Sequence, residues 1–76
     1  TSINFTIPHD GKTALAVYNI AGQKIRTLIS GFTAAGSHSV MWNGRDDAGR
    51  MVSSGVYIAH LRAGNAVSSR KMLLMK

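Results

Sequence analysis

Few residues of this chain are of types that could do chemistry, and they lie far apart in the sequence. The three histidines, His9, His38 and His60, do not have the mutual spacing of a metal-binding motif. No serine lies in a nucleophile elbow, no carboxylate pair is spaced for acid–base catalysis, and no glycine-rich loop has the phosphate-binding pattern. We therefore expect no catalytic residue, no metal site and no cofactor.

One segment does gather chemically suggestive side chains, and it follows Trp42. Residues 43–49 are Asn-Gly-Arg-Asp-Asp-Ala-Gly, and their side-chain oxygens could be calcium ligands. The loop lacks the alternating acidic ligands and the terminal glutamate of a calcium loop, whereas hydrogen bonds within a turn explain Asp46 and Asp47 more simply. An exposed Trp42 could stack on a sugar ring. It continues an apolar strand face, however, so we expect it in the core.

The length and composition of the chain limit its class. Seventy-six residues form one domain, which we place over residues 1–76. The absence of cysteine excludes a disulfide framework, a cysteine zinc site and a thiol nucleophile. The apolar runs fall well short of the ~20 residues that span a bilayer, and no signal peptide opens the chain. Because it also starts without methionine, we expect it to be part of a larger protein.

The charge is strongly basic. Nine lysines and arginines stand against three aspartates, for a formal charge of +6. Such an excess of positive charge could bind a nucleic acid, an anionic lipid or an acidic polysaccharide. The basic residues are scattered along the chain, however, and Arg70-Lys71 is their only adjacent pair. Scattered charges keep a small β domain soluble and its strand edges unpaired, so we expect no nucleic-acid partner.

The elements that would position these residues are strands, because apolar and polar residues alternate along most of the chain. Gly22 closes a short hairpin, and the odd spacing of Ile25 and Leu28 predicts a bulge between them. No segment has helical periodicity, so the pattern predicts an all-β protein, an antiparallel sandwich of six or seven short strands. The expected strands are residues 3–7, 13–20, 24–29, 37–42, 50–53 (a short strand or an extended link), 55–62 and 66–75.

Six segments, which together span most of the chain, carry a family pattern: residues 3–8, 15–28, 35–44, 46–49, 54–57 and 70–76. With them the sequence resembles two related families. One is the C-terminal sorting domain of the type IX (Por) secretion system, and the other is the Ig-like domain of the flagellar hook-assembly scaffolding protein. Gln23 and Asn43 depart from the usual Arg and Asp. We call the following positions the marker residues: Gly22, Trp42, Gly44, Asp46, Gly49, Gly55 and Tyr57.

The resemblance implies an Ig-like β-sandwich of about seven short strands and, as the leading hypothesis, a sorting function. In sorting domains the last strand is read by the export machinery while the cargo is attached to the cell surface. This chain stops directly after such a strand, beside which Gly55 and Tyr57 would lie. The expected recognition residues are Lys71, Met72, Leu73, Leu74, Met75 and Lys76.

The sorting hypothesis brings further expectations about partners and place. The partners would be secretion-machinery proteins and the N-terminal cargo domain of the same chain, with cell-envelope polysaccharide as an additional ligand. The domain would be monomeric, and it would travel through the periplasm to the cell surface or beyond.

Two alternatives come from different classes. The first is a structural or assembly module of the flagellar-hook type, which works by protein–protein contact. The second is a carbohydrate-binding module appended to a glycoside hydrolase, for which Trp42 would be the sugar platform.

Overall fold

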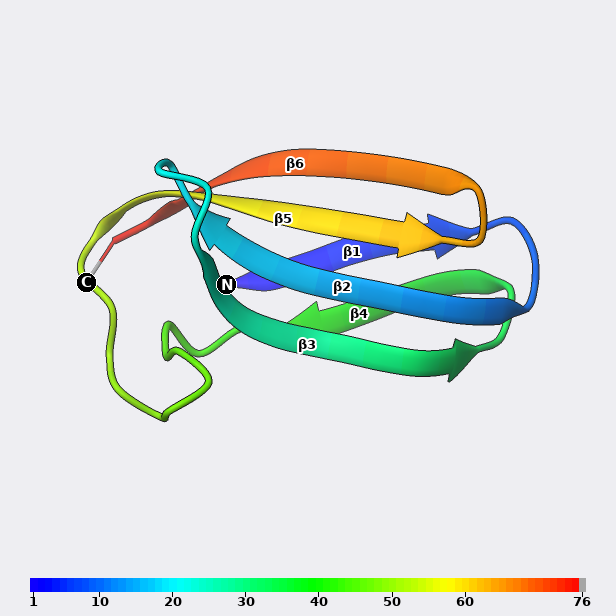
Figure 1. Ribbon diagram of the computed structural model, residues 1–76, viewed down its shortest axis with the longest axis horizontal. Helices are drawn as coiled ribbons and strands as arrows, with labels where there is room; N and C mark the ends of the chain where they lie inside the picture. The colour runs from blue at the N-terminus through cyan, green and yellow to red at the C-terminus, as the bar shows by residue number, and fades with distance from the viewer. Residues whose placement is uncertain (76) are drawn as a thin grey trace.

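Six strands form two antiparallel sheets in the computed structural model, which describes residues 1–75 (Figure 1). The smaller sheet pairs β1 with β4, and the larger has the order β3-β2-β5-β6. Within residues 1–75 no helix has the length and apolarity that crossing a bilayer needs. The predicted all-β antiparallel sandwich is confirmed. Its strands are β1 (Ser2–Ile7), β2 (Gly11–Asn19), β3 (Lys24–Thr33), β4 (Gly36–Met41), β5 (Gly55–Ala63) and β6 (Ala66–Leu74).

Residues 50–53 do not form a seventh strand, so residues 1–75 hold six strands, the lower of the two predicted numbers. The segment has one isolated bridge, between Arg45 and Met51, and is the extended link that was its alternative. The backbone N–H of Val52 donates to the carbonyl of Gly44, at 3.0 Å. The loop thus folds back on itself, because its turn bonds engage the backbone groups that a sheet would need.

Strand β3 is longer than predicted, since it continues beyond the expected end at residue 29. It stays paired with β2 as far as the partners Gly11 and Thr33. Two register shifts leave Ile25 and Leu28 without a direct partner on β2. Both side chains pack partly buried against the core. The predicted bulge is therefore confirmed, and it turns two oddly spaced apolar residues to the same side.

The core lies between the sheets and is centred on Trp42, whose exposed fraction is 1%. The ring of Tyr57 meets it edge to face, with centroids 5.2 Å apart. The hydroxyl of Tyr57 donates to the carbonyl of Ser53, at 2.7 Å, so its one polar atom is satisfied. A buried tryptophan cannot stack on a sugar, and the expectation of a core position is confirmed. The remaining members of the buried cluster are Ile3, Leu15, Val17 and Ala59.

The two sheets are unequal in width, and this asymmetry shapes the surface. Two strands spaced ~4.8 Å apart cannot cover four, so part of the larger sheet lacks a facing layer. In Figure 1 the pair β1 and β4 lies behind β2, β3 and β5, while β6 extends past it. One side of the sandwich is therefore open.

Candidate functional site

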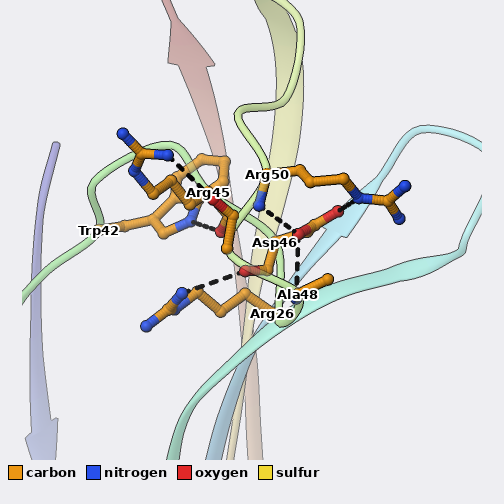
Figure 2. A network of polar contacts seen from close by, with 7 residues as sticks. Arg26, Trp42, Arg45, Asp46, Ala48 and Arg50 are labelled. Carbon is orange, nitrogen blue, oxygen red and sulfur yellow. Dashed lines mark hydrogen bonds and ion pairs between the residues drawn. The ribbon is translucent and has the colours of Figure 1, made fainter.

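The loop after Trp42 is a turn organised by one carboxylate (Figure 2). Oδ1 of Asp46 accepts hydrogen bonds from the backbone N–H groups of Ala48 and Arg50, at 3.0 and 2.9 Å. Its other oxygen, Oδ2, lies 3.6 Å from Nε of Arg50. The N–H of Gly49 donates to the carbonyl of Asp46. The backbone bond from Arg50, helped by that from Ala48, holds the pKa of Asp46 below its ordinary value.

The same loop is tied to strand β3, which is an edge of the larger sheet. The N–H of Thr27 donates to Oδ1 of Asp47, and the N–H of Asp47 donates to the carbonyl of Ile25, both at 3.0 Å. Nη1 of Arg26 donates to the carbonyl of Asp46, at 3.2 Å. These contacts engage backbone groups on an edge that would otherwise be free to pair with another chain.

Trp42 anchors the loop through a hydrogen bond from its indole ring. Its Nε1 donates to the carbonyl of Arg45, at 3.0 Å, and Nη1 of Arg45 donates to the carbonyl of Gly49, at 2.9 Å. Gly44 is buried with φ +75°, and a Cβ there would lie 3.5 Å from Leu74 of β6. Positive φ favours glycine at this position. The loop passes close to the side chain of Leu74 here, so it packs against the last strand.

The arrangement of this loop is architectural. Oδ1 of Asp46 and Oδ1 of Asp47 accept hydrogen bonds from backbone N–H groups, as the turn interpretation predicts. Within residues 1–75 no three side chains of metal-binding type come together. Gly22 has a comparable structural role in the β2–β3 hairpin: its φ is +83°, and Asn19 accepts its N–H. The marker residues thus shape turns, fill the core, or pair with the last strand.

Two of the three histidines, His38 and His60, are engaged in packing. His38 stacks on Phe5 with ring centroids 5.4 Å apart, and its Nε2 lies 2.7 Å from the carbonyl oxygen of Ala34. His60 meets Tyr18 edge to face on the outer side of the larger sheet, where Tyr18 is half-buried. His9 is exposed in the turn before β2. The fold does not bring the three together.

The first four residues of the expected recognition segment, 71–74, lie on β6, an edge strand of the larger sheet. Lys71, Leu73 and Met75 are exposed, whereas Met72 and Leu74 pack against the core. Gly55 pairs with Leu74 and Tyr57 with Met72, so both lie beside the strand as expected. Lys76 falls outside the described residues. Recognition by an export machinery stays a prediction.

A feature that the sequence did not predict lies on the open side of the sandwich. A groove of about 670 Å³ is lined by β1 and by the facing side of β2, β5 and β6, with Ser37, His38 and Ser39 of β4 also contributing, and we call it the β1–β6 groove. Polar residues at inward positions of β6 were the available signal, since Ser68 and Arg70 alternate in phase with Met72 and Leu74. Its lining includes Phe5, Leu15, Ala59, Leu61, Ser68 and Arg70.

Comparison with known proteins adds the family. The model of the FlgD Ig-like domain matches residues 1–67. The chain belongs to the FlgD Ig-like domain family. The crystal structure of FlgD from P. aeruginosa is similar, at 25% sequence identity and a TM-score of 0.69, and the match covers 96% of this chain and 58% of that one. No curated protein sequence matches.

Membership of the FlgD Ig-like family agrees with the second resemblance, that to the hook-assembly protein. The family match ends at residue 67, before the segment 71–76 on which the sorting hypothesis depends. Nothing in the comparisons supports type IX sorting. They favour the hook-type module, which the sequence placed second, over the sorting domain that it placed first. This family is a structural and assembly module rather than a known enzyme.

Proposed function

We propose that this chain is a non-catalytic structural module of the flagellar-hook type, which acts by protein–protein contact within a larger protein. The proposal is carried by the family match over residues 1–67 together with the likeness to FlgD along nearly the whole chain. The chain spans 58% of the FlgD chain it resembles. Hook assembly, as a property of that whole protein, is therefore extended to this one as part of the proposal.

Two features of the structure support a contact module over a reactive site. Asp46 and Asp47 are engaged in the turn, and His38 and His60 in ring packing, as described above. Several large apolar side chains are exposed on strands and loops, where they are available for contacts with other proteins. They are Ile20, Phe32, Met41, Met51, Val56, Val67, Leu73 and Met75.

The sorting domain is the rival hypothesis, and one experiment separates the two. Residues 1–76 are deleted from the parent gene in the native host, in parallel with a deletion of residues 71–76 alone. Hooks are then counted by electron microscopy, and the surface-exposed fraction of the parent protein is measured by protease shaving. A hook-type module predicts that the full deletion abolishes hooks.

The outcomes discriminate clearly. Loss of hooks, with the parent protein still exported, supports the proposal. Normal hooks, with the parent protein retained inside the cell in both deletion strains, overturn it in favour of sorting. Normal hooks and normal export in both strains overturn both hypotheses. Monomeric state and surface location remain predictions on either view.

A further inference from the structure

The free edge of β1 points into the β1–β6 groove. The N–H of Trp42 donates to the carbonyl of Thr1, at 2.8 Å, so the alternation of an antiparallel ladder can be followed from this pair along β1. The backbone groups of Ile3, Phe5 and Ile7 turn toward β4. Those of the residues between them turn to the open edge, and these residues are Ser2, Asn4 and Thr6.

The groove beneath this edge has an apolar floor. Leu15 and Ala59 are buried in it, and Phe5 and Leu61 are half-buried. A volume of about 670 Å³ lies within the range of sites that hold a ligand. A strand added to β1 would extend the smaller sheet over β5 and β6, the part of the larger sheet that lacks a facing layer. The groove therefore offers a place for one additional strand beside β1.

Arg70 supplies the charge. Of the described residues that line the groove, it alone is a lysine, arginine, aspartate or glutamate. Its Nη1 donates to the carbonyl of Asn4 on the open edge, at 3.4 Å, a long bond that an incoming chain can replace. The aspartates are engaged elsewhere: Asp10 accepts from the N–H of Ala35, and the other two lie in the loop after Trp42.

We propose that the β1–β6 groove binds an extended segment of a partner protein, which adds to β1 as a third strand. Its alternate side chains are apolar and enter the groove, and one acidic side chain pairs with Arg70. Backbone pairing supplies affinity, while the floor and the arginine supply selectivity. The net charge of +6 opposes a second copy of this chain as the occupant. This inference rests on the proposed function, a module that acts by protein–protein contact.

The test uses the 76-residue chain and a labelled peptide of about eight residues, in which valine alternates with threonine and one glutamate is placed centrally. Binding is measured by fluorescence anisotropy at physiological salt, and amide protection in the chain by hydrogen exchange. Control peptides replace the glutamate by lysine, or a central residue by proline, which removes a backbone donor. Arg70→Glu reverses the groove charge, and Arg62→Glu makes the same charge change at an exposed site outside the groove.

Binding of the acidic peptide is expected, with new protection at the amides of Ser2, Asn4 and Thr6. Arg70→Glu should weaken it by about tenfold or more, and Arg62→Glu should leave it nearly unchanged. Equal weakening by both variants, or equal binding of the lysine peptide, would reduce the effect to general charge attraction and overturn the proposal. Protection confined to β6 would overturn it as well.

A further arm tests an occupant from the same polypeptide. The parent protein is prepared with the residues that precede Thr1. If the β1 amides are already protected there and the peptide no longer binds, the groove belongs to the parent chain, and the partner proposal fails. Failure of peptide binding in these experiments leaves hook formation in the deletion strain as a separate measurement, so the proposed function stands or falls independently.

Discussion

The loop end of the sandwich, around Trp42, and its open side, along β1 and β6, differ in how completely their inward-facing residues are covered. At the loop end the aromatic core is closed, and Asp47 and Arg26 bind the loop to β3. On the open side Phe5 is half-buried, and a lone arginine reaches across to β1. The closed end holds the fold together, and the open side is the surface on which we propose that a partner binds.

The largest expected effect is that of Trp42→Ala. Removing a fully buried tryptophan creates a cavity, and such changes cost about 3–5 kcal/mol. In a domain of this size, that is a large share of the free energy of unfolding. Urea unfolding followed by circular dichroism measures it. A loss below about 1 kcal/mol would contradict the assignment of this end as the core.

Phe5→Ala is the matching change on the open side. Its ring is half-buried and stacks on His38, so we expect a loss of about 1–2 kcal/mol, well below that of Trp42→Ala. The same urea titration provides the comparison. Equal losses at the two positions would break the contrast between the closed end and the open side.

Asp47→Ala tests the bond between the loop and β3. The N–H of Thr27 loses its acceptor, and we expect a loss of about 1 kcal/mol. Hydrogen exchange at Thr27 should accelerate in parallel. Asp47→Asn keeps an acceptor oxygen and should retain most of the stability; if both variants lose the same amount, the carboxylate charge matters instead of the hydrogen bond.

The smallest effect is a pH dependence that comes from Asp46. Its pKa is lowered in the folded protein by the backbone N–H of Arg50, so the unfolded chain binds its proton more tightly. The resulting stabilisation is complete above the unfolded pKa of ~3.9 and disappears as the pH falls through the folded pKa. Asp46→Asn should flatten this part of the curve, measured by urea unfolding between about pH 5 and about pH 2. Parallel curves for the two proteins would contradict it.

Much of the fold follows from local patterns. Alternation located the strands that form, the oddly spaced Ile25 and Leu28 predicted their bulge, and the apolar face before Trp42 predicted its burial. The errors occur where pairing decides the structure. Residues 50–53 were a possible strand but hold only the isolated bridge of Met51 to Arg45, whereas β3 continues past Gly31 because the start of β2 lies beside it.

The same distinction between local pattern and tertiary structure applies to function. The marker residues identified a pattern that two families share, and the ordering of the two hypotheses relied on the final strand. The comparison with the FlgD Ig-like family reversed that ordering. The only sign of the β1–β6 groove in the sequence is indirect. Ser68 and Arg70 occupy inward positions of β6, where a strand facing a closed core would have apolar residues.

The amino-acid sequence by itself determined which residues alternate, where glycine permits a turn, and which aromatic ring must be buried, because these follow from the backbone and from the solubility of side chains. Tertiary structure alone decided that two strands face four, that Asp47 binds the edge of β3, and that Arg70 spans an open groove. Each of these depends on which strands lie next to one another although they are far apart in the sequence. The alternation of apolar and polar residues does not determine this, because it is the same whichever sheet a strand joins.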